Sequence, residues 1–197
     1  MTVVETDRIE MAQSSDDERT LDMMFEWLEN VPVPEGYKTE IVGGHIFMSP
    51  QRDNHWDIIA DVYDQLRTKY PRRRLKSDVR IDYPGHLNGF ATDLTLVSEG
   101  AKKNDKGHWL CQDVEFVMEV ISRSTGMNDY GQKKAAYAEA EVPVYLIVDP
   151  YTRKCVLHTL PVDGEYTAEQ RFTFGDPVDL TKTPLDITLA TDEFPTE

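Results

Sequence analysis

The chain has 197 residues and a formal net charge of −15, and 40% of its residues are hydrophobic. This length and composition favour one globular domain and exclude a wholly disordered chain. No apolar run approaches the roughly 20 residues that cross a bilayer. The first ten residues hold three acids, unlike a secretory signal peptide, and two cysteines are too few for a disulfide framework. We therefore expect a cytoplasmic protein that does not contact a membrane.

The negative charge is concentrated at the two ends of the chain. Residues 1–40 carry a net −8 and residues 151–197 a net −5, whereas residues 41–150 carry only −2. Such a chain is not steered to nucleic acid over long distances, but its middle could still contact a phosphate backbone. The one strongly basic run, RTKYPRRRLK at residues 67–76, fits a nucleic-acid contact and a solvated helix end equally well.

The first elements are a helix and a hairpin. Residues 1–16 are predicted to be a flexible acidic lead, in which Ser14-Ser15-Asp16 would cap the following helix. Apolar residues at i, i+3, i+4 and i+7 from Leu21 predict that helix over residues 17–29. A hairpin is expected over residues 37–48, with Gly43-Gly44 as its two-residue turn.

The rest of the chain alternates helices and strands. A second helix should be capped by Asp53 or Asn54 and end before Pro71. Strands are then expected at residues 79–83, 89–97, 114–121 and 143–148, with a polar loop at 98–112 and a helix at 128–140. This order predicts a mixed α/β fold, in which a mixed β-sheet is flanked by helices and extended by the N-terminal helix and hairpin. We assign one domain to residues 17–190, followed by an acidic tail at 191–197.

Two carboxylates stand where the strand pattern requires apolar residues. Asp93 lies in the middle of GFATDLTLV, and Glu119 lies in FVMEVI. An ionised carboxylate that is buried without a partner costs several kcal/mol, so two on adjacent strands would share a metal ion or a proton. Oxygen ligands suit Mg²⁺ or Mn²⁺. The alternative is that one or both lie at strand ends in solvent, and we accept this for Glu115.

Lys133 is the third candidate. It lies in the first turns of the helix that follows the Glu119 strand. On its own it could be half of an ordinary Asp129–Lys133 helical pair, which contributes only about 0.2–0.5 kcal/mol.

Longer segments resemble a known family. EVISRSTGMNDYGQKKAAYAEAEVPVYLIVDP, residues 119–150, is similar to the signature of the Uma2 (DUF820) family of restriction-endonuclease-like proteins. YKTEIVGGHIFMSP, residues 37–50, resembles the N-terminal hairpin of that family, and His55 matches the histidine that follows it. ATDLTLV, residues 91–97, resembles the strand with its central aspartate. The similarity spans about residues 37–160.

The resemblance implies a restriction-endonuclease-like core of the PD-(D/E)XK nuclease superfamily. By position, Asp93 and Glu119 would bind Mg²⁺, for which Mn²⁺ is a substitute, with the Val120 carbonyl as a further oxygen. Lys133 would position the attacking water, and Glu40 would be a further acid of the site.

The chain departs from the family pattern at two places. Thr92 replaces the usual proline before the aspartate, which affects strand geometry more than chemistry. Ile121 stands two residues after Glu119, where the motif has its lysine, so the lysine must come from the following helix. Lys133 is the nearest candidate, and Lys134 is the second choice, about 100° away around the helix.

The resulting hypothesis is a Mg²⁺-dependent endonuclease that hydrolyses phosphodiester bonds, with DNA as its partner. The alternative is a catalytically silent module that retains the fold and binds nucleic acid or another protein. A homodimer would suit cleavage of two strands, although no residue indicates one.

Overall fold

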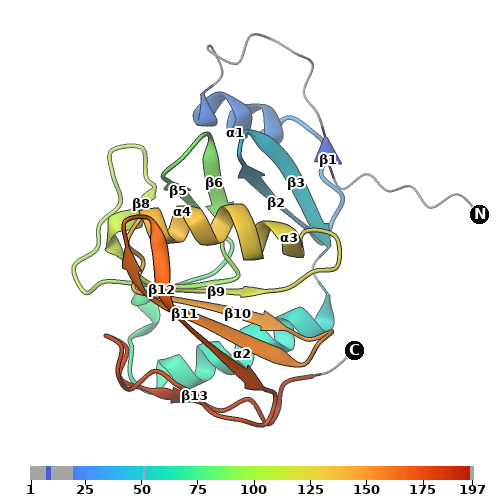
Figure 1. Ribbon diagram of the computed structural model, residues 1–197. Helices are drawn as coiled ribbons and strands as arrows, with labels where there is room; N and C mark the ends of the chain where they lie inside the picture. Colours follow the sequence, from blue (N-terminus) through green and yellow to red (C-terminus); the bar gives the residue numbers. More distant parts are fainter. Residues whose placement is uncertain (1–7, 10–19, 51, 196–197) are drawn as a thin grey trace, which may run out of the picture.

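The chain builds two six-stranded sheets, one above the other in Figure 1, in a computed structural model that describes residues 8–9, 20–50 and 52–195. The upper sheet has the order β1-β3-β2-β6-β5-β8 and the lower sheet the order β12-β11-β10-β9-β7-β4. In these orders the upper strands are Arg8–Ile9, His45–Pro50, Tyr37–Val42, Asn88–Ala91, Arg80–Tyr83 and Trp109–Leu110. The lower strands are Glu165–Thr173, Lys154–Val162, Val144–Asp149, Val114–Val120, Leu94–Val97 and Leu75–Lys76. Both sheets mix parallel and antiparallel pairs, since β9 pairs with β10, and β5 with β8, in parallel.

Helices cover the sheets and separate them. Helix α1 (Leu21–Glu29) packs on the outer face of the upper sheet, and α2 (Asp53–Arg67) packs on the outer face of the lower sheet. Between the sheets runs one continuous helical segment. It consists of α3 (Gly126–Asn128), the π-helical η4 (Asp129–Lys133) and α4 (Lys134–Glu139). A short ribbon, β13 (Val178–Asp179) with β14 (Thr188–Leu189), and the 3₁₀ turns η2 (Arg72–Arg74) and η3 (Cys111–Asp113) complete the elements. The predicted mixed α/β fold with an N-terminal helix and hairpin is confirmed.

Alternation along β9 decides which side chains face the space between the sheets. Phe116 and Met118 belong to the core that α2 covers, and Val117 belongs to the core that α4 shares with the upper sheet. Because successive strand side chains point to opposite faces, Glu119 lies on the Val117 face. The strand therefore directs Glu119 between the sheets.

The chain crosses from one sheet to the other at two neighbouring places. The predicted strand 89–97 is wrong, because β6 ends at Ala91 in the upper sheet and β7 begins at Leu94 in the lower one. Strands β4 and β5 are divided in the same way at residues 77–79. The amide of Asp78 donates to the carbonyl of Thr92 at 3.0 Å and ties the two crossings together. Asp93 is therefore at a junction between sheets and not in the middle of a strand.

The ends of the first two helices differ from the predictions. Helix α1 is capped by Thr20, whose hydroxyl accepts from the amide of Met23 at 3.2 Å; the predicted cap at 14–16 lies outside the described residues. Helix α2 begins at Asp53, and Arg52 is its N-cap residue without a side-chain cap bond. The predicted cap was wrong because Asp53 is already helical, in a first turn where its charge suits the helix dipole.

The predicted hairpin turn is confirmed. Gly43 and Gly44 have φ angles of +59° and +76°, which glycine adopts without strain and which a tight two-residue turn requires. Strands β2 and β3 pair on either side of the turn, from Val42 opposite His45 to Tyr37 opposite Pro50. Lys38 and Glu40, two residues apart on β2, consequently share one face of the upper sheet. In the described part of the chain, no helix is long and apolar enough to span a membrane.

Candidate functional site

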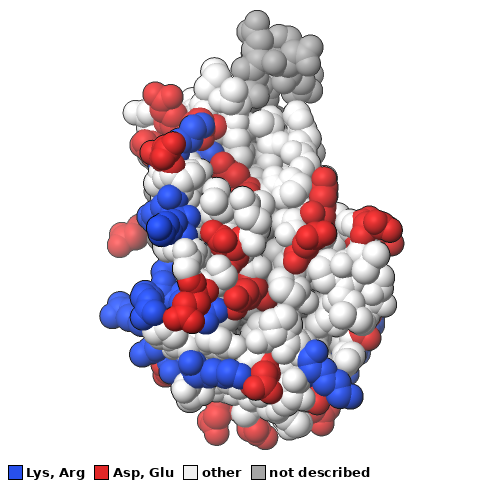
Figure 2. All heavy atoms as spheres, turned by 90° about the vertical axis from the view of Figure 1, so that its left-hand side faces the viewer, with Lys and Arg blue, Asp and Glu red and all other residues white. Residues whose placement is uncertain are grey.

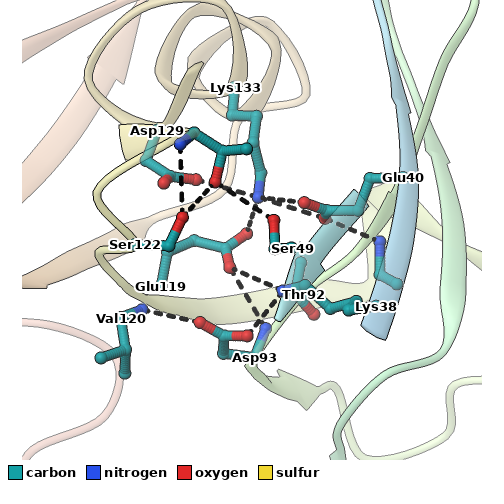
Figure 3. A network of polar contacts seen from close by, with 12 residues as sticks. Lys38, Glu40, Ser49, Thr92, Asp93, Glu119, Val120, Ser122, Asp129 and Lys133 are labelled. Atoms are coloured by element: carbon teal, nitrogen blue, oxygen red, sulfur yellow. Dashed lines mark hydrogen bonds and ion pairs between the residues drawn. The ribbon is translucent and has the colours of Figure 1, made fainter. Parts of the chain in front are cut away.

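A polar pocket lies between the sheets, beside the crossing at Thr92 and Asp93, and Figure 3 shows the side chains gathered around it. Its lining consists of Lys38, Glu40, Ser49, Pro50, His55, Asp93, Glu119, Val120, Ser122, Thr125, Asn128, Asp129 and Lys133. All four residues that the sequence singled out, Glu40, Asp93, Glu119 and Lys133, are therefore brought together. They come from β2, the β6–β7 junction, β9 and η4.

Backbone amides of the facing segments hold the carboxylates of Asp93 and Glu119 in place. The amide of Val120 donates to Asp93 Oδ2 at 2.7 Å, and the amide of Asp93 donates to Glu119 Oε2 at 3.2 Å. The side chains of Asp93 and Glu119 are only 6% and 1% exposed. These bonds join the two segments where the crossing ends β7, and Asp93 Oδ1 and Glu119 Oε2 lie on either side of a common volume (Figure 3).

Lys38 occupies that common volume. Its Nζ lies 2.6 Å from Asp93 Oδ1 and 3.8 Å from Glu119 Oε2, and the lysine side chain is 9% exposed. Sequence reasoning missed this residue. The signal that could have found it is the strand period, because Lys38 shares a face with Glu40, which the family resemblance had already placed near the site.

Lys133 is surrounded by carboxylates. Its Nζ lies 2.6 Å from Glu119 Oε1, 2.9 Å from Asp129 Oδ1 and 3.1 Å from both oxygens of Glu40. The Asp129–Lys133 pair considered in the sequence is thus present, but inside a buried network and not on a solvated helix face. Lys134, the second choice, is outside the pocket lining.

One π-helical turn supplies two of these groups. Asp129 and Lys133 are the first and last residues of η4, four positions apart and therefore on one side of the helix, and both are buried; π-turns are frequent at functional sites. Tyr137, one turn later on α4, donates from its hydroxyl to Glu119 Oε1 at 2.6 Å. Sequence reasoning did not assign Asp129 or Tyr137 to the site, because neither interrupts an apolar pattern.

The charges in the pocket do not cancel. Four carboxyl groups, on Glu40, Asp93, Glu119 and Asp129, face two ammonium groups, on Lys38 and Lys133, which leaves a formal charge of −2 when all four are ionised. Burial raises the pKa of Glu119 to about 8 and that of Asp129 to about 6, although the lysines oppose both shifts. Excess negative charge out of contact with water is costly. The pocket is therefore suited to a divalent cation.

Burial and neighbouring charges also oppose each other in setting the pKa values of Asp93 and Lys133. Burial opposes ionisation of Asp93, but Lys38 and the amide of Val120 hold its pKa below the ordinary value. Burial also disfavours a charge on Lys133, yet the carboxylates of Asp129, Glu119 and Glu40 raise its pKa well above the ordinary value. Both groups are consequently charged at neutral pH.

His55 and the residues after Glu119 form one rim of the pocket. The imidazole Nε2–H of His55 donates to the carbonyl of Ile121 at 3.0 Å, and burial lowers the pKa of the ring, so it is neutral at pH 7. The hydroxyls of Ser122 and Thr125 bond to each other, and the amide of Gly126 donates to the carbonyl of Ser122. These contacts hold the turn that leads into α3.

A second group of potential ligands lies elsewhere. Oxygen and nitrogen atoms of Asp22, Asp82 and His108 come within 4.8 Å of one another. However, Arg80 already contacts both carboxylates at 2.7 Å, and Lys106 contacts Asp22 at 2.5 Å. This group is half-exposed and already neutralised by cations, so the pocket between the sheets is the better metal candidate.

The donor set of that pocket fits a hard divalent ion. Asp93 Oδ1 and Glu119 Oε2 already converge on one cation, the Lys38 ammonium, and carboxylate oxygens are the ligands that Mg²⁺ and Mn²⁺ prefer. Val120 also lines the pocket and offers a backbone carbonyl.

Comparisons with known proteins agree with this architecture. The model of the Uma2 family, described as "Putative restriction endonuclease", matches residues 23–192. Among solved structures, the chain is similar to a "putative nuclease belonging to DUF820" from Anabaena variabilis ATCC 29413, with a TM-score of 0.68 and 12% sequence identity. The match covers 89% of this chain and 97% of that one, and at this identity it shows the fold alone. No curated protein matches the chain.

Proposed function

Because the chain belongs to the Uma2 family, we propose that it is a metal-dependent endonuclease that hydrolyses phosphodiester bonds of DNA. One observation carries the proposal above all. Two buried carboxylate oxygens, one from the β6–β7 junction and one from β9, converge on a single cation, in a pocket whose four carboxyl groups outnumber its two ammonium groups. Such a pocket is of little use to a merely structural core, which apolar residues would stabilise equally well.

In the proposed site, Asp93 and Glu119 would hold Mg²⁺ or Mn²⁺, with the carbonyl of Val120 as a further oxygen. When bound, the ion supplies positive charge opposite the scissile phosphate and lowers the pKa of a water molecule. Lys133, kept charged by three carboxylates, orients the attacking water or stabilises the charge that develops on the phosphate. Glu40 and Asp129 hold the Lys133 ammonium in place from two sides.

The direct test is calorimetric titration with Mn²⁺ of the wild type, Asp93→Ala and Glu119→Ala. One site in the wild type that both variants lose would place the two carboxylates around one ion. Glu115→Ala is the matched control, because Glu115 lies on the same strand but pairs with Arg74 outside the pocket, and it should titrate like the wild type. Cleavage of plasmid and oligonucleotide DNA with Mg²⁺ then follows for the same four proteins.

A second candidate is a silent module that keeps the fold without turnover. The observation that favours it is Lys38, whose ammonium neutralises Asp93 without any metal. If Mn²⁺ does not bind to the wild type even when an oligonucleotide is present, because substrate phosphates can complete a metal site, the silent module replaces the nuclease.

A further inference from the structure

A second, larger hollow lies beside the candidate site and has a different chemistry. It is a groove of about 890 Å³ between α2 and the edge strand β4, and we call it the α2–β4 groove. Trp56 and Tyr63 contribute its aromatic wall, Leu94 part of its floor, and Arg72 and Arg73 its charged rim. Trp56 is 62% exposed, an unusual position for the largest side chain of a helix face.

The groove lies on the α2 side of the lower sheet and the candidate site on its other side, and neighbouring residues of the chain line the two hollows. Trp56 follows His55, and Leu94 follows Asp93, so two groove residues are direct neighbours of two residues that line the polar pocket. Ser77, at the same end of the groove, precedes Asp78, whose amide is bonded to Thr92. A ligand in the groove therefore reaches the crossing between the sheets.

The basic run 67–76 divides into structural and available charges. Arg74 contacts Glu115 at 2.5 Å and the carbonyl of Val97, and Lys69 contacts Asp186 at 2.9 Å. By contrast, among the described residues Arg72 has no ion pair, and Arg73 has only a 3.8 Å contact with Glu99 across solvent. Arg72 and Arg73 are both exposed at the rim of the groove.

Figure 2, which shows the left-hand side of Figure 1, places lysine and arginine side chains along one side of this face, with acidic side chains close to them. The chain is strongly acidic overall, so local charge and stacking, and not long-range attraction, must hold an anionic ligand.

We propose that the α2–β4 groove binds a single nucleic-acid strand beside the candidate site, with an unpaired base stacked on Trp56 and phosphates against Arg72 and Arg73. Flat aromatic side chains together with cations that track the backbone are the features that single-strand binding proteins combine. A paired base would leave the exposed Trp56 ring without a stacking partner. This inference rests on the proposed function for the claim that the bound strand is cleaved, but binding of the strand can be measured without cleavage.

The test is fluorescence anisotropy with a labelled 20-nucleotide single strand, and with the same strand in a duplex, in EDTA so that nothing is cleaved. Trp56→Ala should weaken single-strand binding roughly 5- to 150-fold with the salt dependence unchanged. The double variant Arg72→Ala/Arg73→Ala should lower the slope of log K against log salt by about 1.4, at about 0.7 for each phosphate contact.

The control for the tryptophan is Trp27→Ala, whose ring is 38% exposed on α1. The control for the arginines is the double variant Lys154→Ala/Arg171→Ala on β11 and β12. Both control proteins should bind the strand like the wild type. All substituted side chains are exposed, so circular dichroism melts should coincide. The inference is overturned if the wild type does not bind the strand, if the groove variants bind as well as the controls, or if the duplex binds more tightly than the single strand.

The two proposals fail separately. Normal binding by the groove variants, with metal-dependent cleavage by the wild type, would overturn the groove and leave the nuclease. Loss of binding in the groove variants, with no cleavage by the wild type under any metal, would support the groove as a binding surface and overturn the nuclease.

Discussion

Lys38→Met should make the protein less stable without metal and bind metal more tightly. Lys38 is the cation between Asp93 and Glu119, and methionine keeps most of its volume without its charge. In the wild type a divalent ion must first separate Lys38 from Asp93. In the variant the two carboxylates face the same volume with no ammonium in it.

The structure sets the size of both effects. The pair is buried, with side chains 9% and 6% exposed, and removing one partner of a buried pair costs about 3–5 kcal/mol of stability. If a third of that cost opposes metal binding in the wild type, its removal tightens the Kd for Mn²⁺ by about tenfold, since 1.4 kcal/mol corresponds to a factor of ten. At a concentration about 100 times the Kd, the metal then restores roughly 2.7 kcal/mol.

The assay combines two measurements: chemical denaturation in the presence and absence of Mn²⁺, and calorimetric titration of the metal-free protein with Mn²⁺. Lys69→Met is the control, because Lys69 pairs with Asp186 in solvent, and such pairs contribute only about 0–1 kcal/mol. The reasoning would be refuted if Lys38→Met were as stable as the wild type without metal, or if it bound Mn²⁺ more weakly. Weaker binding would mean that Lys38 supports metal binding and does not compete with the ion.

Three further outcomes are expected. Lys133→Met should lower kcat for DNA cleavage much more than substrate affinity. Lys134→Met, one position along the helix and outside the pocket, should leave both unchanged. Equal losses in the two variants would contradict the assignment of Lys133 to the site. The pKa of Glu119 is about 8 in the folded chain against 4.5 in the unfolded one, so between these pH values the native state holds a proton that the unfolded state has released. As pH rises from about 4.5 to 8, this residue should therefore lower the free energy of unfolding by up to about 1.4 kcal/mol per pH unit. Denaturation at several pH values should show that slope reduced in Glu119→Gln, and an unchanged slope would assign it to other groups. Gly89→Ala should destabilise the protein by about 1–3 kcal/mol, because its new Cβ would lie 2.5 Å from the ring of Phe25; urea denaturation measures this, and an unchanged midpoint would mean that α1 can move aside.

The site residues that could be predicted from sequence are those that break a pattern. Asp93 and Glu119 interrupt apolar runs, so burial and hydrophobic period alone pointed to them. The pairing of β7 with β9, which brings them together, agrees with the expected adjacent strands. Glu40 and Lys133 needed the family resemblance, because the polar positions of a hairpin strand and a helix turn are ordinary places for charged residues.

The rest depends on information that a local pattern does not contain. GFATDLTLV has the composition of one strand throughout, and the division at Thr92 and Asp93 is fixed by which sheet each half pairs with. Lys38 meets Asp93 from 55 positions away, through the upper sheet. Such contacts follow from topology, whereas propensity and period act over a few residues only.

The two crossings between the sheets also have a mechanical consequence. If one sheet turned against the other, residues 77–79 and 92–93 would be the segments that bend, together with η3, which joins β8 to β9, and the Asp78–Thr92 bond would restrain the first two segments. Displacement in a rotation grows with distance from its axis, so the edge strands furthest from the crossings in the two sheet orders, β1 and β12, would travel furthest. Asp93 itself lies in one of these segments, so its ion pair with Lys38 would keep its length in a motion that displaces the far edges of both sheets.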